Sequence, residues 1–292
     1  MTEPIGLNLH EDEALFRETV NFTASRTGFN ARLIEKDYFC TVLLGYLAEH
    51  GGDRLVFKGG TCLAKVHAGF YRLSEDLDFT IPLPVDANRT QRRQAVAEIK
   101  DAVAGVADRI PALTTIKPLA GANNSTQYNG AVAYQSPTTG QPETILTEAS
   151  VREPLLMPAV TASARTLLLD PISGGAAVGA VEARCISMDE AMAEKFRAAL
   201  SRKEVAIRDF YDLEYAVKHI ELDPASDHIA NLVLQKLSVP GNLPVDVGAQ
   251  RLADLKRQLD TRLRTVLRES DFQTFDLDRA IRLVVTMAER LG

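Results

Sequence analysis

The sequence predicts an α/β (α+β) fold in which a sheet-containing part is followed by a helical part. Between residues 54 and 150, short apolar runs alternate with turn-forming residues, which is typical of strands. From Ser187 onward the apolar residues recur with helical spacing. The chain has 292 residues, more than one hydrophobic core usually supports. We therefore expect two domains, residues 1–185 and residues 186–292.

Apolar periodicity and turn residues place the elements of the first domain. Helices are predicted over 11–24, 31–49 and 89–109, and strands over 54–57, 71–81 and several stretches of 112–150, of which 144–151 is the clearest. A glycine turn at 58–61 separates the first strand from a helix start at 62–67. In the second domain, Ser187 and Glu190 have the spacing of a capping box, which predicts that a helix begins there.

The charge balance limits the possible partners. The net charge of −6 argues against non-specific binding to duplex nucleic acid, which relies on many Lys and Arg contacts to phosphates. Two local basic stretches remain, each interpretable as a solvated helix face or as a nucleic-acid contact: Arg89, Arg92 and Arg93, and Arg251, Lys256, Arg257, Arg262, Arg264 and Arg268. No apolar run approaches the ~18 residues of a membrane helix, and Met1–Asp12 has no signal-peptide pattern. We expect a cytoplasmic protein without membrane contact.

Two aspartates on a predicted strand are the main candidates for chemistry. Asp76 and Asp78 are two residues apart, so a pleated strand would project both carboxylates from one face, with Ser74 on the same side. Two carboxylates held so close repel each other unless a cation lies between them. Hard oxygen ligands at a strand end suit a two-magnesium site for phosphoryl transfer. Alone, the pattern is also compatible with a solvated pair on an edge strand.

The glycine turn adds a second feature. Gly59 and Gly60 allow the backbone to approach a ligand closely, and the turn opens a helix whose N–H groups can bind phosphate oxygens. Thr61 offers a hydroxyl, and Lys58 a charge that could offset developing charge on a triphosphate. A glycine pair after a strand is commonly only a turn, but its combination with the aspartate pair predicts a nucleotide site that uses an NTP.

Five motifs resemble the AbiEii/AbiGii-type nucleotidyltransferase toxins, which include the MenT-type toxins. They are Ile34–Asp37, Phe57–Thr61, Arg72–Asp78, Ala193–Arg202 and Arg208–Asp212, and the resemblance covers about residues 30–220. It implies a DNA-polymerase-β-like nucleotidyltransferase core with a helical C-terminal half. It also implies a cognate antitoxin and, as in some members, addition of nucleotides to the 3′ end of transfer RNA.

The resemblance also suggests roles for residues that periodicity alone leaves as solvated charge. Lys195 and Arg202 would form a basic side for a triphosphate, and either Asp209 or Asp212 would orient Lys195, with Asp209 preferred. The polymerase-β-like scheme has a third carboxylate on a neighbouring strand, for which Glu148 is the candidate metal ligand or general base. Alternatively, Glu148 is a plain exposed strand residue without a role in the site. Lys36 and Asp37 are interpreted as a structural ion pair that supports the site.

The sequence thus predicts a Mg²⁺-dependent nucleotidyltransferase toxin that transfers a nucleotide from an NTP to RNA, at the tRNA 3′ end. One alternative is an enzyme that modifies a small molecule or a protein, which the acidic net charge favours. Another is a nucleotide-binding module without turnover. The preferred base and the oligomeric state have no visible signal in the sequence.

Overall fold

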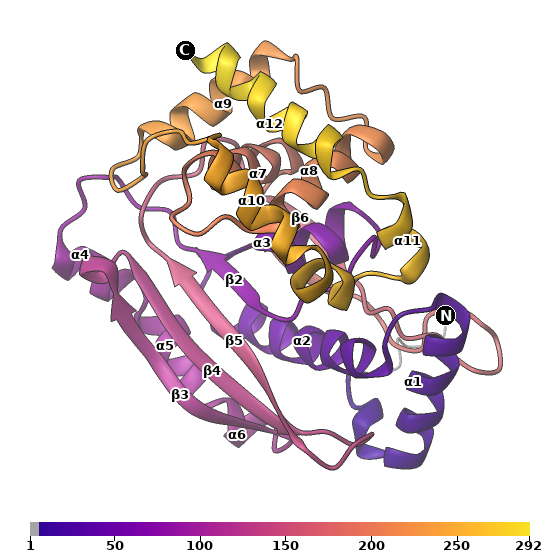
Figure 1. Ribbon diagram of the computed structural model, residues 1–292. Helices are drawn as coiled ribbons and strands as arrows, with labels where there is room; N and C mark the ends of the chain where they lie inside the picture. Colours follow the sequence, from indigo (N-terminus) through magenta and orange to yellow (C-terminus); the bar gives the residue numbers. More distant parts are fainter. Residues whose placement is uncertain (1–5) are drawn as a thin grey trace. The chain divides into compact units, whose positions relative to one another are not determined.

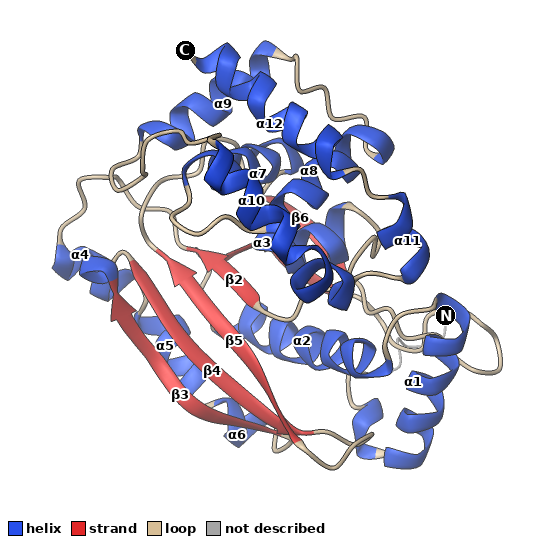
Figure 2. Cartoon of the chain, in the orientation of Figure 1, coloured by secondary structure: helices blue, strands red, loops and turns tan. Residues whose placement is uncertain are grey.

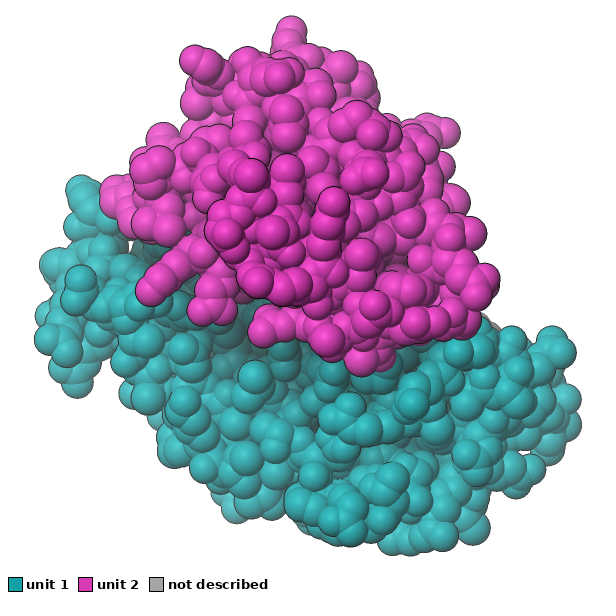
Figure 3. Space-filling view, viewed as in Figure 1, with its two compact units in different colours: residues 1–155, 159–186 teal, residues 156–158, 187–292 magenta. Residues whose placement is uncertain are grey.

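The computed structural model describes residues 6–292, so the first five residues of the Met1–Asp12 stretch lie outside the described chain. The chain divides into two compact units (Figure 3). Unit 1 comprises Met1–Leu155 and Ala159–Ile186, and unit 2 comprises Leu156–Pro158 and Ser187–Gly292. Along residues 6–292, no helix is long and apolar enough to cross a membrane.

Unit 1 is built on a mixed seven-stranded sheet in the order β3-β4-β5-β2-β1-β7-β6 (Figure 2). The strands are β1 Val56–Lys58, β2 Leu77–Thr80, β3 Leu113–Ala122, β4 Gln127–Gln135, β5 Pro142–Ser150, β6 Val160–Ala164 and β7 Val181–Cys185. Two pairs, β1 with β7 and β2 with β5, are parallel, and the others are antiparallel. The predicted α/β (α+β) class is therefore confirmed.

The helices of unit 1 include α2 (Ala31–His50) and α5 (Ala97–Ala104), which lie against one face of this sheet (Figure 1). The helices of this unit are α1 Glu13–Thr27, α2 Ala31–His50, α3 Gly59–Cys62, α4 Arg89–Ala95, α5 Ala97–Ala104 and α6 Val106–Arg109, with a π-helix at Leu63–His67 and 3-10 turns at Leu9–Glu11 and Asn123–Ser125. The side chains of Phe57, Phe79, Ala149 and Tyr128 form a buried row across β1, β2, β5 and β4. Because strand side chains alternate, their neighbours in sequence point to the other face.

Two predictions about unit 1 need correction, and two strands were missed. The strand expected over 71–81 is only four residues long, because the backbone before Leu77 pairs with no strand. The helix expected over 89–109 is broken at Val96 and Gly105, where the backbone leaves helical angles. Strands β6 and β7 were not foreseen, since their alternation is short and lies beside a glycine-rich stretch.

Unit 2 is helical. Its elements are α7 Met188–Ser201, α8 Ile207–His219, α9 Asp227–Ser238, α10 Ala249–Gln258, α11 Glu269–Thr274 and α12 Leu277–Leu291, with a π-helix at Leu259–Leu263 and a 3-10 turn at Arg264–Val266. The Ser187 hydroxyl accepts from the Glu190 N–H, which confirms the predicted helix start. Glu190 itself is buried and accepts from the N–H groups of Leu156 and Met157. These two hydrogen bonds explain why three residues before β6 belong to unit 2.

Candidate active site

The candidate active site of unit 1 begins with a row of polar residues on the sheet face opposite the buried row. Lys58 of β1 pairs with Asp78 of β2, and Asp78 pairs with Glu148 of β5. Directly opposite residues on paired strands project to the same face. All three side chains are part-exposed, whereas the adjoining Phe57 and Phe79 are 1% exposed. The register therefore places one cation and two carboxylates side by side on an accessible surface.

The glycine turn lies directly against Asp78. Gly59 has φ +77°, a left-handed conformation that favours glycine. A Cβ atom at Gly59 would overlap the Asp78 carboxylate and lie 2.8 Å from the Asp78 Cβ. Any other residue there would displace the carboxylate, so the absence of a side chain at Gly59 lets the Asp78 carboxylate pack directly against the turn.

The next residue of the turn is equally confined. A Cβ at Gly60 would lie 2.5 Å from the Arg72 Nη2 and 3.3 Å from the Ser74 Oγ. Ser74, which the sequence predicted to lie on the side of the two aspartates, therefore lies beside the turn. Sequence reasoning assigned no role to the buried Arg72 guanidinium, although Arg72 opens one of the five motifs. Its position brings a cation to the turn that is expected to bind phosphates.

Asp76 immediately precedes β2, so the strand pleat orients only Asp78. Thr61 is buried, and its hydroxyl donates to the Asp76 carbonyl. The neighbouring Glu75 carbonyl accepts from the Cys40 thiol at 3.6 Å. Side chains of α2 and of the glycine turn therefore hold the Asp76 backbone in place of a strand partner. Asp76 is part-buried, as is Asp78.

The predicted ion pair between Lys36 and Asp37 is wrong, because adjacent helix residues do not face each other. Lys36 Nζ instead contacts Glu75 Oε2 at 2.8 Å, which ties α2 to the segment before Asp76. Asp37 Oδ1 contacts the fully buried Lys65 at 2.5 Å, and Asp37 Oδ2 accepts from the Leu167 N–H. The Lys36–Glu75 and Asp37–Lys65 ion pairs still support the site, and each joins residues that are distant in sequence.

The donor set of unit 1 fits a divalent cation of the magnesium type. Carboxylate oxygens are the ligands that Mg²⁺ prefers, and the cradle beside Gly59 leaves the Asp78 carboxylate uncovered by a side chain there. Among residues 6–292, no three Asp, Glu, His or Cys side chains converge closely enough to hold an ion together. Glu148 is in register with Asp78, and its service as a third ligand stays a prediction.

Unit 2 contains the other predicted residues, centred on Lys195 of α7. Lys195 Nζ contacts Asp209 Oδ1 at 2.8 Å and Asp212 Oδ2 at 2.7 Å. The Arg202 guanidinium also reaches Asp209, at 3.3 Å. The four residues therefore form one cluster, which we call the Lys195 cluster, and both aspartates contact the lysine rather than one of them.

The Lys195 cluster differs from a purely structural pair in the same unit. Lys236 is 1% exposed and contacts Glu190 at 2.6 Å and Glu194 at 3.2 Å. Lys195 retains 14% exposure, and the Arg202 side chain retains 57%. The cationic side of the Lys195 cluster thus reaches the surface, while its aspartates are buried.

The comparisons with known proteins agree with the motifs. A family model described as "Nucleotidyl transferase AbiEii toxin, Type IV TA system" matches residues 42–282. The fold is similar to MenT4, a nucleotidyltransferase toxin from Mycobacterium tuberculosis, with TM-score 0.56 and 19% identity over 96% of this chain and 98% of MenT4. It is also similar to JHP933 from Helicobacter pylori, with TM-score 0.52 and 18% identity over 90% and 93% of the two chains. A search of curated protein sequences finds no match.

The family match spans both units and most of the chain. It contains four of the five motifs, begins after Ile34–Asp37 and extends past the last motif to residue 282. Nucleotidyltransferases use NTP substrates and typically divalent metal ions, in keeping with the carboxylates of unit 1. The predicted resemblance and the predicted enzyme class are confirmed. The chain belongs to the AbiEii family of nucleotidyltransferase toxins of type IV toxin–antitoxin systems.

Proposed function

We propose that this nucleotidyltransferase toxin uses Mg²⁺ and transfers a nucleotide from an NTP to RNA, at the 3′ end of tRNA. The observation that carries the proposal is the close approach of the Gly59 turn to the Asp78 carboxylate. It joins a backbone suited to phosphates with ligands suited to magnesium. The RNA acceptor and its 3′ end rest on the family resemblance.

In this scheme Asp76 and Asp78 hold the metal ions, and Glu148, opposite Asp78, serves as a further ligand or as the general base. The chemistry that Mg²⁺ supplies when bound is activation of the attacking hydroxyl and stabilisation of the leaving oxygen. Gly59 and Gly60 accommodate the phosphates, with Thr61 and Ser74 beside them. Lys58, in register with Asp78, offsets negative charge on the phosphates.

Lys195 and Arg202 contribute positive charge toward the triphosphate, and Asp209 and Asp212 hold Lys195 in one orientation. Two short contacts leave the lysine ammonium little rotational freedom. A preoriented cation stabilises developing charge without reorganisation during the reaction. The aspartates are therefore positioning residues.

The direct test is incubation of the protein with labelled NTPs, total RNA and Mg²⁺, together with Asp76→Ala and, as a matched control, the exposed Asp86→Ala. We expect label in small RNA with the unmodified protein and Asp86→Ala, and almost none with Asp76→Ala or with EDTA. Equal labelling by Asp76→Ala would contradict the proposed site. Label in protein or in small molecules, with none in RNA, would establish the alternative acceptor class instead.

Family membership implies a cognate antitoxin, and we propose that the toxicity it restrains depends on this nucleotidyl transfer. Expression of the unmodified protein should slow growth, and expression of Asp76→Ala should not. Immunoblots of both proteins would exclude a difference in amount. Equal toxicity of both would contradict the link between transfer and growth arrest.

A further inference from the structure

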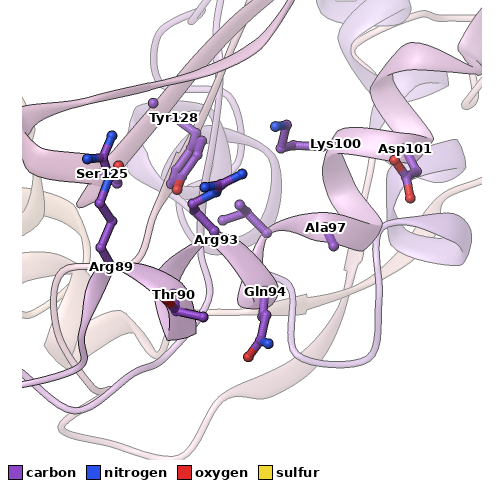
Figure 4. A pocket seen from close by; sticks show the side chains of 11 residues that line it. Arg89, Thr90, Arg93, Gln94, Ala97, Lys100, Asp101, Ser125 and Tyr128 are labelled. Carbon is purple, nitrogen blue, oxygen red and sulfur yellow. The ribbon is translucent and has the colours of Figure 1, made fainter.

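A second polar pocket lies in unit 1, between α4, α5 and the β3–β4 hairpin. Its volume is about 570 Å³, within the range of pockets that hold small molecules or segments of larger ligands. Three cations line it, Arg89, Arg93 and Lys100, against one acid, Asp101. Figure 4 shows Arg93 and Lys100 extending toward the ring of Tyr128, while Gln94 points away. We call it the α4 pocket.

The charge in the α4 pocket is not neutralised. Within residues 6–292, none of Arg89, Arg93 and Lys100 forms an ion pair or a side-chain hydrogen bond with the protein. The chain as a whole carries a net charge of −6, so unpaired cations gathered in one pocket are a local exception. Clustered cations without protein partners suit an anionic ligand, since their mutual repulsion falls when it binds.

The other basic stretch of the sequence behaves differently. Arg264 contacts Asp260 at 3.1 Å and Glu269 at 2.6 Å, Arg268 contacts Asp271 at 2.5 Å, and Arg257 pairs with Asp254. The buried Arg251 donates to the carbonyls of Ala199 and Arg202. Lys256 and Arg262 alone in that stretch have no such partner in the described chain. In the first stretch Arg92 donates to the carbonyls of Asn124 and Val85, while Arg89 and Arg93 line the pocket. The two stretches look alike in sequence, and the structure favours Arg89 and Arg93 of the first as part of the anion site.

Tyr128 supplies an independent sign of a ligand. Its side chain is 3% exposed and lines the pocket, and its hydroxyl has no hydrogen-bond partner among the described residues. A buried hydroxyl without a partner costs stability in the free protein. The adjoining turn is also strained, because Asn123, Asn124 and Ser125 all have positive φ. Two features of this pocket, the unpartnered hydroxyl and the strained turn, therefore lower the stability of the free protein.

The sheet register relates this pocket to the candidate active site. Tyr128 pairs with Ala149, which pairs with Phe79, the residue after Asp78. Two interstrand spacings make about 10 Å between the Tyr128 and Phe79 backbones. Tyr128 and Asp78 lie on opposite faces of the sheet. Tyr128 lies close to the end where β2 and β5 finish and β4 begins, whereas Asp76 and the Gly59 turn lie at the opposite end of the short strand β2. An RNA chain in contact with both places would pass around the end of the sheet and along β2.

We propose that the α4 pocket binds phosphodiester groups of the acceptor RNA close to its reacting end. This inference rests on the proposed function, because it names how the acceptor is held. Arg89, Arg93 and Lys100 would contact phosphate oxygens, and the Tyr128 hydroxyl would donate to one of them. An extended polyanion suits an open pocket with several unpaired cations better than a single small anion does.

The test measures binding of a fluorescent single-stranded RNA, without NTP, to the full-length protein, the triple variant Arg89→Ala/Arg93→Ala/Lys100→Ala, and the control Lys256→Ala/Arg262→Ala. We expect the triple variant to bind about tenfold more weakly or worse, and the control to bind like the unmodified protein. The slope of log affinity against log salt should shrink by about 0.7 for each phosphate that the triple variant no longer neutralises. Equal affinity and slope in both variants would overturn the proposal.

Tyr128→Phe is the second variant, because it removes one oxygen and keeps the ring. We expect RNA affinity to fall several-fold while the Tm stays equal or rises, by on the order of 2 °C, since the unpartnered hydroxyl is gone. Unchanged RNA affinity would show that the hydroxyl touches no ligand and would overturn its place in the proposal. Inorganic phosphate or AMP can be tested as a competitor of RNA binding. If either displaces the RNA at concentrations well below those at which salt alone does, the pocket belongs to a small phosphorylated ligand and the RNA assignment is overturned.

The labelling assay separates this inference from the proposed function. If the unmodified protein labels RNA and the triple variant labels it equally well at limiting RNA, the pocket proposal fails and the function stands. If no RNA is labelled by any protein, yet RNA binding still depends on the three cations, the function fails, and with it the acceptor role of the bound RNA, while the assignment of the pocket as an RNA-binding site stands.

Discussion

The row of Lys58, Asp78 and Glu148 in unit 1 and the Lys195 cluster of unit 2 both gather charged residues, but they differ in how those charges are exposed and arranged. Asp78 and Glu148 lie next to each other on a part-exposed sheet face, and the Asp78 carboxylate packs directly against the glycine turn. Lys195 is held between two buried aspartates at 2.7–2.8 Å. The first arrangement presents carboxylate ligands on an accessible face, whereas in the second the lysine and the aspartates compensate one another's charge. We infer that substitutions in the first affect activity most, and those in the second also affect stability.

Asp78→Asn should have the largest effect. It keeps the shape of the side chain and removes the negative charge that a metal ion requires, so nucleotide transfer should fall by about 100-fold or more. The control is Asp86→Asn, an exposed acid of the same unit. Initial rates of label transfer at saturating Mg²⁺ provide the measurement, with thermal unfolding to check folding. A reduction below about threefold would remove Asp78 from the metal site.

Gly59→Ala should be the next most harmful, and Gly69→Ala is its matched control. Both glycines have positive φ, +77° and +64°, so each alanine costs about 1 kcal/mol in backbone strain. A Cβ at Gly69 meets nothing within 4 Å, whereas one at Gly59 overlaps the Asp78 carboxylate. We expect Gly59→Ala to lose at least as much stability as Gly69→Ala, and Gly59→Ala alone to lower the transfer rate, by on the order of 10–100-fold. Equal rates for the two variants would show that the turn does not act through Asp78.

In the Lys195 cluster, Asp212→Asn should lower the free energy of unfolding by about 1–3 kcal/mol, because Asp212 is fully buried and its charge compensates Lys195. Asp209→Asn should cost less, since the side chain is 6% exposed and its second partner Arg202 is largely solvated. Chemical denaturation of both variants gives the two values. The reverse order would mean that Arg202, rather than burial, sets the strength of the cluster.

The smallest expected effect is on pH. Burial lowers the pKa of His67, whose ring contacts the Ile186 carbonyl, and burial likewise lowers the pKa of His10. Each histidine binds a proton more weakly in the folded than in the unfolded protein. Their contribution to stability is therefore present above the unfolded pKa of about 6.5 and is lost as the pH falls through it. Unfolding free energies should decline between about pH 7.5 and 5.5, and less steeply in His10→Asn/His67→Asn. A steeper decline in that variant would reverse the assigned sign.

Local pattern predicted much of the fold, and its failures have identifiable causes. Helix α1 and strand β5 follow from periodicity, because each buries one stripe or face. Helix α2 follows from its length and apolar content, since it is buried on all sides from Leu33 to Leu44. The segment before Asp76 has the pattern of a strand yet pairs with none, because hydrogen bonds from Thr61, Cys40 and Lys36 hold it instead. Those hydrogen bonds join residues that are 15 to 39 positions apart, so no local window could reveal them.

The candidate site shows the same division. The motifs named Asp76, Asp78 and the Gly59 turn, and the family they indicated is the one that the chain belongs to. The motifs did not show that Glu148 stands in register with Asp78, nor that Lys36 and Asp37 choose different partners. Strand register and ion pairing depend on which elements become neighbours, and this is settled only when they pack.

Residue types and short-range spacing were enough to predict the family and the fold class of this protein, because the family is marked by short motifs and the fold class by local apolar periodicity. Which of two similar basic stretches keeps unpaired charge was decided by folding alone. One stretch folds next to Asp254, Asp260, Glu269 and Asp271, and the other faces a pocket with a single acid. The strength of a charge depends on its partners in space, and long-range packing determines those partners.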